Sequence, residues 1–276
     1  MTSAPVSTTP APAAAAASPA VVAFALRERA RALIRAAFPR RRTRVILTRT
    51  YDDFEAAFRT TLVDAAIVDI GRAEDETWRV ASRAREYPSA PFFGLAVLRS
   101  AEGPALAQCA ELEFADVLVD GIDDGVARDL VAHASFSARF ARALASPPPA
   151  LALETPLQHA AWQFVVSHAG MPVRTSALAA SVRVTREHLS RSFAAGGAPN
   201  LKRIIDLVRL IAAAELSKNP GYDVRDVANV LGFASSSHLS STAMRIVGSK
   251  PASLARLRTI DLVDRFVKGH RRSRGD

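Results

Sequence analysis

The chain has 276 residues, enough for two domains, and its hydrophobic fraction of 49% supports packed cores. Its single cysteine, Cys109, excludes an intramolecular disulfide and a thiolate-rich zinc site, and charged residues interrupt its apolar stretches before the roughly 18 residues that a membrane span needs. The formal net charge of +9 favours a polyanionic partner, because Lys and Arg neutralise phosphates. We therefore expect a cytoplasmic protein without a membrane segment, a cofactor or a bound metal.

Both ends of the chain and one internal segment have compositions that indicate boundaries. Residues 1–19 are rich in Ala, Pro, Ser and Thr, which predicts a disordered lead, and they lack the Lys or Arg that starts a secretory signal. Three consecutive prolines at 147–149 are incompatible with a continuing helix, so 137–152 is predicted as a helix end and a Pro-rich linker. We expect one domain at 20–136, a second at 153–262 and a basic tail at 263–276.

The first half alternates between strand and helix patterns. Strands are predicted at 21–26, 44–48, 65–70, 91–97 and 116–119, and helices at 27–38, 51–60, 74–85, 103–112 and from 123 to about 133 or beyond. This alternation predicts an α/β domain with a five-stranded parallel sheet of the flavodoxin-like kind, covered by helices on both faces. After the prolines every apolar pattern has a helical period, which predicts an all-α second domain.

Two short helices joined by a tight turn are predicted between 175 and 193. Thr185 is placed to cap the second helix, and Leu189 and Phe193 share one face that would pack on Leu178. The residues left facing outward are Arg186, Glu187, Ser190 and Arg191. In a helix-turn-helix the second helix enters the DNA major groove, where an arginine can bond a guanine edge or a phosphate.

The same pattern returns at 224–241, with Gly232 suited to the turn and Phe233 predicted to be buried. Between the two units, 201–217 is predicted as one helix with an apolar stripe made by Ile204, Ile205, Val208, Ile211 and Ala212. At 1.5 Å per residue it spans roughly 25 Å. A connector of that length could hold two recognition helices about one DNA turn apart, roughly 34 Å.

Together these residues resemble the DNA-binding domain of the AraC/XylS family. The resemblance rests on Thr185, Leu189, Arg191 and Phe193, on Arg209, Leu210 and Ala213, on Asp226-Val227-Ala228 before Gly232-Phe233, and on Gly248 and Pro251. It implies a double helix-turn-helix that binds DNA through Thr185, Arg186, Glu187, Ser190, Arg191, Ser235, Ser236, Ser237, His238, Ser241 and Arg245. Where the family has aromatic and basic residues, this chain has His238, Leu239, Ser241, Ala243 and Met244, so the second recognition helix is unusually neutral. Base recognition is therefore expected to depend on the first unit.

The first domain resembles the receiver domain of response regulators in its pattern of elements. Asp69 occupies the phosphoacceptor place. The other functional residues of a receiver are replaced in this chain. Ala25 and Leu26 stand where the resemblance places the acidic pair that holds Mg²⁺, and Asp120 stands where it places the lysine of the fifth strand. Leu98 or Arg99 stands where it places the Ser or Thr of the fourth strand. We therefore expect control of this domain through protein or ligand binding, not through phosphorylation of Asp69.

Several alternatives stay open. Basic residues at 40–44 are interpreted as a solvated turn, whereas Lys268, His270, Arg271, Arg272 and Arg274 in the tail are equally consistent with phosphate contact. His188 is equally consistent with a DNA contact and with a surface residue, and Cys109 is expected in the core. No catalytic motif is present, so an enzyme is not expected. An architectural DNA-binding protein without strong sequence preference is the alternative function, and RNA polymerase and a second copy of the chain are candidate partners.

Overall fold

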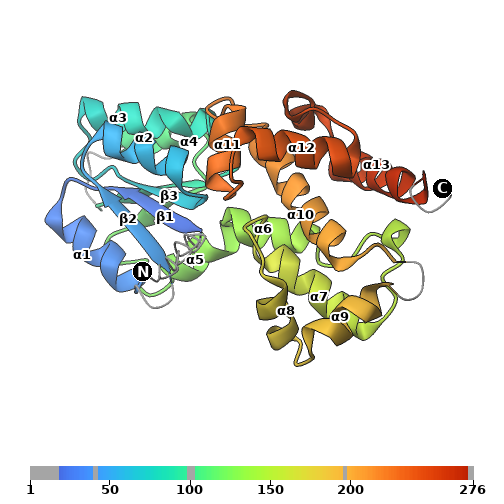
Figure 1. Cartoon of the computed structure of the whole chain (residues 1–276). Coiled ribbons are helices and arrows are strands. Elements are labelled where there is room, and N and C mark those ends of the chain that lie inside the picture. Colours follow the sequence, from blue (N-terminus) through green and yellow to red (C-terminus); the bar gives the residue numbers. More distant parts are fainter. Residues whose placement is uncertain (1–18, 40–42, 98–102, 195–197, 273–276) are drawn as a thin grey trace, which may run out of the picture.

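The computed structural model describes residues 19–39, 43–97, 103–194 and 198–272. Nearly all of the predicted lead, the basic residues 40–42, Leu98, Arg99 and Arg274 lie outside this described part. Figure 1 shows a sheet with its helices on one side of the molecule and a wholly helical part on the other. The α/β and all-α classes expected for the two halves are both present.

A five-stranded sheet forms the centre of the first part. Its strands are β1 (Ala20–Phe24), β2 (Arg44–Thr48), β3 (Val63–Asp69), β4 (Phe92–Ala96) and β5 (Asp116–Val119). All four strand pairs are parallel, and the order is β2-β1-β3-β4-β5. This is the order of the flavodoxin-like doubly wound fold, so the predicted sheet is confirmed.

Helices cover both faces of the sheet, which explains why β1 and β4 are buried along their whole length. They are α1 (Glu28–Ala37), α2 (Tyr51–Thr60), α3 (Asp75–Ala81), α4 (Gly103–Glu111), α5 (Ala127–Ala134) and α6 (Phe136–Ala143), with a 3₁₀ turn, η1 (Ser82–Arg85), after α3. On β1, Val22 and Phe24 point to the core under α2, α3 and α4, and Val21 and Ala23 point to the core under α1 and α5. The alternation of side chains along a strand thus builds two separate cores.

One predicted helix is divided in two. The segment expected to be helical from 123 begins as α5 at Ala127, and α6 starts after a break at Ser135. Ser135 has extended backbone angles, and its hydroxyl accepts a hydrogen bond from the amide of Ala138 at 3.3 Å. A serine in this conformation caps a new helix, so α6 leaves the sheet in a new direction.

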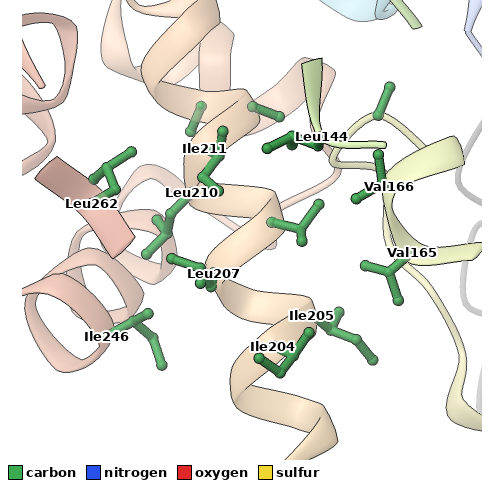
Figure 2. Packing of buried hydrophobic residues seen from close by; sticks show 14 of the residues in the cluster. Leu144, Val165, Val166, Ile204, Ile205, Leu207, Leu210, Ile211, Ile246 and Leu262 are labelled. Carbon is green, nitrogen blue, oxygen red and sulfur yellow. The ribbon is translucent and has the colours of Figure 1, made fainter. Parts of the chain in front are cut away.

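The second part contains η2 (Pro149–Leu151), α7 (Pro156–Ser167), α8 (Thr175–Ser181), α9 (Arg186–Ala194), α10 (Leu201–Leu216), α11 (Val224–Val230), α12 (Ser236–Val247), η4 (Pro251–Arg256) and α13 (Thr259–Arg272). The prediction of a single apolar stripe on α10 was too narrow, since α10 is buried on nearly all sides. Figure 2 shows the reason, because Val165 and Val166 of α7 lie on one side of α10 and Ile246 and Leu262 lie on the other. Because α10 is covered on both sides, it is an interior helix, and its buried residues include the charged Asp206 and Arg209. None of the helices in the described ranges is long and apolar enough to cross a membrane.

Among the described residues, the two parts contact each other around α11 and around α6. At the first, the side-chain amide of Asn229 on α11 donates to the carbonyl oxygen of Arg59 on α2 at 2.7 Å, and the Arg59 guanidinium lies 3.4 Å from the Asp226 carboxylate. Beside this contact the rings of Tyr87 and Tyr222 have centroids 4.8 Å apart. At the second place, α6 contributes two phenylalanines to the core of the helical part. The sheet domain is therefore packed directly against the helical part.

Candidate nucleic-acid interface

The first helix-turn-helix unit consists of α8 and α9. The Thr185 hydroxyl accepts a hydrogen bond from the amide of His188 at 3.1 Å, so it caps α9 as expected. Leu189 and Phe193 are fully buried against Leu178, which fixes the rotation of α9. With that face inside, the opposite face of α9 is left on the surface of the protein.

A concave surface on this unit gathers the outward residues of α9. Its lining residues are Thr175, Arg186, Glu187, Ser190, Arg191, Asn200, Leu201 and Lys202. Sequence reasoning had identified the four from α9 but not Thr175, Asn200 or Lys202, which come from the starts of α8 and α10. Asn200 caps α10 by accepting from the amide of Arg203 at 3.0 Å. An asparagine before a helical pattern is a typical N-cap, so the sequence could have indicated Asn200. The start of a helix favours phosphate, because its free amide groups point outward.

The charges on this concave surface favour an anion. Arg186 lies 3.5 Å from Glu187, but both side chains are two-thirds exposed, so their attraction is weak. Among the described residues, no acidic side chain lies within 4.0 Å of Arg191 or Lys202. Two cations beside the start of α10 are thus available to an incoming phosphate or base edge.

The second unit consists of α11 and α12. Its turn contains Gly232 at a φ of 61°, and Phe233 is buried, as predicted. Ser235 caps α12 by accepting from the amide of His238 at 3.0 Å. The hydroxyl of Ser241 donates to the His238 carbonyl oxygen at 3.0 Å. These serines are therefore engaged with the backbone of their own helix.

The exposed groove of the second unit is mostly apolar. Its lining residues are Val224, Ser237, Ser240, Ser241, Met244, Lys250, Pro251 and Ala252. Ser237 and Ser241 are brought into this groove, whereas Ser235, Ser236, His238 and Arg245 do not line it. The half-exposed Arg245 instead lies 2.9 Å from the Asp206 carboxylate of α10. Lys250, which sequence reasoning missed, is the one cation among the lining residues, all of which belong to the described part of the chain.

A buried arginine on α10 links the turn that precedes the first unit to the turn of the second unit. The Arg209 guanidinium donates to the carbonyl oxygens of Gly170, Leu231 and Gly232 at 3.4, 3.0 and 3.3 Å, and it lies 3.8 Å from the ring centroid of Phe233. Gly170 closes the turn after α7, whereas Leu231 and Gly232 form the turn of the second unit. Burial lowers the pKa of Arg209, because charge is costly in the interior. The family resemblance had singled out Arg209 without indicating this link.

At the carboxyl ends of the strands, Arg27 lies between the acidic residues Asp69 and Asp120. Asp69 is 1% exposed, and its carboxylate accepts from Arg27 Nε at 2.9 Å and from the amide of Gly71 at 3.2 Å. Arg27 also lies 3.7 Å from Asp120, whose carboxylate in turn accepts from Arg29 Nε at 2.9 Å. A fixed guanidinium thus supplies positive charge beside Asp69. Sequence reasoning missed Arg27 because it lies 42 positions from Asp69 in the chain.

The remaining candidates have simpler places. Cys109 is buried on α4, and burial raises the pKa of its thiol to about 11. The predicted basic tail is helical up to Arg272, because α13 continues through it. His188 is exposed on α9 but does not line the concave surface of the first unit.

Comparison with known proteins gives a family match for the helical part. A family model described as a helix-turn-helix domain (HTH_18), which is of the AraC type, matches residues 178–256. The crystal structure of full-length FixJ from B. japonicum matches over 87% of this chain and 98% of that chain, with 12% sequence identity and a TM-score of 0.36. No curated protein matches the sequence.

Proposed function

Because residues 178–256 form an AraC-type helix-turn-helix domain of a DNA-binding transcription regulator, we propose that the protein recognises a specific DNA sequence with two helix-turn-helix units in adjacent major-groove segments. The observation that best supports this proposal is the concave surface of the first unit, where Arg186, Arg191 and Lys202 converge. Arg186 and Arg191 lie on the outward face of α9, which would face base edges, and Lys202 at the start of α10 would meet a phosphate.

The connection between the units supports recognition of two segments at once. α10 is an interior helix, and Arg209 binds turns on both sides of it. Two units fixed in this way meet DNA with a set spacing, which is the requirement for contacting successive turns of one groove. In this proposal the neutral groove around Ser237, Ser241 and Met244 contributes contact area and water-mediated contacts, and Arg191 contributes most of the base discrimination.

Control of this regulator is proposed to depend on protein or ligand binding to the first domain. A receiver that is phosphorylated needs a metal ion beside its acceptor aspartate. Here Arg27 lies against Asp69 and Asp120, so a metal would have to displace a guanidinium held by two carboxylates. The natural partners are RNA polymerase and a second copy of the chain, and the cytoplasm is the matching compartment.

The alternative function is an architectural DNA-binding protein with weak sequence preference. The lining of the second groove favours it, because eight residues there include one cation and no arginine. Such a protein would bind mainly through phosphates, and unrelated DNA would compete well.

A mobility-shift assay separates the two functions. Full-length protein would be titrated onto a fragment from its own promoter region with excess unrelated DNA, over a salt series. Arg191→Ala is expected to lose about 1 to 3 kcal/mol of binding to the specific fragment only. Lys202→Ala is expected to weaken both DNAs alike and to reduce the salt slope by about 0.9. Arg35→Ala, which removes an exposed charge from α1, is the matched control.

Loss of the wild-type complex to competitor, together with equal behaviour of Arg191→Ala and Arg35→Ala, would contradict sequence-specific recognition. That result would favour the architectural function. No binding of either DNA would contradict both functions.

A further inference from the structure

A cleft of about 320 Å³ lies where the two parts of the molecule meet. Its apolar wall is made by Phe136, Phe140 and Leu144 around α6 and by Ile211 of α10. Its charged lining residues are Arg139, on the same helix as the two phenylalanines, Lys218, just after α10, and the acidic Glu215 of α10. The cleft is separate from both DNA-facing surfaces and from the Asp69 site, since it shares no lining residue with them.

Arg139 lacks an acidic partner among the described residues. Arg139 is an exposed residue, and its guanidinium donates to the carbonyl oxygen of Ser89. Burial lowers the pKa of Arg139, and the neighbouring Arg142 lowers it further. An anion beside the guanidinium would oppose both effects. Lys218 is already paired with Glu215 at 2.7 Å, so Arg139 is the stronger anchor for one.

The size and lining of the cleft set the kind of ligand. An apolar cavity of roughly 150 Å³ is enough to hold benzene, and ligand pockets begin at about 300 Å³. The cleft therefore has room for one ring with a small substituent. Phenylalanine walls favour the ring, and a single guanidinium favours a planar carboxylate, which it can bind through two parallel hydrogen bonds.

The residues around the cleft belong to both parts of the molecule. Ser89, just before β4, contributes to the lining and belongs to the first part. Its amide donates to the Asn219 side chain at 2.8 Å, and its hydroxyl accepts from the Asn219 amide nitrogen at 2.9 Å. Asn219 lies in the connection between α10 and α11. A ligand held by Arg139 would therefore contact the residues through which the first domain meets the second helix-turn-helix unit.

We propose that this cleft binds a small organic carboxylate with an apolar ring, its carboxylate on Arg139 and its ring against Phe136 and Phe140. Such a ligand stabilises the contact between the two parts through Ser89 and Lys218. Its role as an effector rests on the proposed function as a DNA-binding regulator, whereas its binding does not. The inference thus names the ligand class and the site for the proposed control.

The structure offers a reporter for binding. The indole of Trp162 is fully buried, and its Nε1 donates to the carbonyl oxygen of Leu144, a wall residue of the cleft, at 2.8 Å. In full-length protein carrying Trp78→Phe, fluorescence then comes from Trp162 alone. The probes are benzoate, the neutral isostere benzamide, and sulfate as an anion without a ring. The titrations contain no DNA, so they are independent of the mobility-shift assay.

Benzoate is expected to give a saturable fluorescence change at millimolar concentration or below, with benzamide and sulfate at least tenfold weaker. Arg139→Gln is expected to weaken benzoate at least tenfold, about 1.4 kcal/mol, while benzamide is unchanged. Arg35→Gln, the charge-matched control on α1, retains wild-type binding. Ala143→Phe places a ring in the cleft from an exposed position and should abolish the response if Arg139→Gln fails to fold.

Three results would overturn the proposal: no saturable benzoate response, equal responses to benzoate and sulfate, or wild-type benzoate affinity in folded Arg139→Gln and Ala143→Phe. If benzoate binds as expected and specific DNA binding is absent, the cleft stands as a ligand site while the proposed function fails. If DNA binding is specific and benzoate does not bind, only the cleft proposal fails.

Discussion

Arg209→Leu tests whether one buried side chain holds the two helix-turn-helix units together. The substitution removes three donated hydrogen bonds and the contact with the Phe233 ring, and it leaves the carbonyl oxygens of Gly170, Leu231 and Gly232 without this donor. A hydrogen bond to a charged group contributes about 1.5 to 3 kcal/mol, and a desolvated cation–π contact about 2 kcal/mol.

Two of these three bonds are long, at 3.3 and 3.4 Å, and leucine avoids the cost of burying a charge, which is shown by the lowered pKa of Arg209. The expected net loss is therefore about 2 to 4 kcal/mol of unfolding free energy, less than the sum of the contacts.

Urea denaturation followed by Trp162 fluorescence measures this loss. Arg203→Leu on the same helix is the matched control, because its guanidinium stacks over Phe266 at 5.2 Å and is only half-buried. It should cost less than about 1 kcal/mol. Mobility shifts below the unfolding transition should show Arg209→Leu with reduced affinity for the full DNA site. An Arg209→Leu protein as stable as Arg203→Leu would refute the argument that Arg209 fixes the two units.

Three further predictions concern the first domain. In Gly71→Ala the new Cβ would lie 2.6 Å from Arg27 Cζ and 2.7 Å from Val97 Cγ2, so the free energy of unfolding measured with urea should fall by about 1 to 3 kcal/mol. The control Gly125→Ala, whose Cβ meets no atom within 4 Å, should be nearly neutral. Equal stabilities of the two variants would count against the packing of Arg27 on Gly71. Burial raises the pKa of Asp64 in the folded state, so the folded protein binds this proton more tightly than the unfolded chain does. The free energy of unfolding should therefore fall as the pH rises through the folded pKa of Asp64. Asp64→Asn should remove this pH dependence in urea denaturation measured across pH, and an unchanged profile would contradict the prediction. Because burial raises the pKa of Cys109 to about 11, the thiol should react with an aromatic disulfide reagent at pH 8 only after urea unfolds the protein, and rapid labelling of native protein would refute this.

Local pattern was enough to predict most elements of the fold. β2, β5 and α2 have the predicted bounds, because each is delimited by turn residues or a cap that the sequence displays, such as Thr50 before α2. The first strand was predicted to begin one residue late and to end two residues late. Ala25 and Leu26 are apolar and continue the pattern, but the chain leaves the sheet after Phe24 and places Arg27 over Asp69.

Contacts between distant residues could not be predicted in the same way. Tyr87 donates to the Gly221 carbonyl oxygen across 134 positions, and a Cβ on Gly221 would lie 2.6 Å from the Tyr87 ring, yet neither residue has a local signal for this partner. The same holds for Arg27 with Asp69, and for Arg139 beside the apolar wall of the cleft. Periodicity indicates which face of an element is buried, but it does not identify the element that covers that face.

These distant contacts bear on how the first domain could influence DNA binding. The domain contacts the second unit through α2 and α11, whereas the cationic surface that contains Arg191 belongs to the first unit. Arg59 of the Arg59–Asp226 pair is half-exposed, so this pair contributes little, and most of the stability of this contact comes from the buried Tyr87 ring packed against the partly buried Tyr222 ring. A change at α2 would thus act first on the second unit, without touching Arg191. Control by this route would alter the preferred spacing of the two half-sites before it altered the preferred bases, and DNA fragments with inserted base pairs between the half-sites would reveal it.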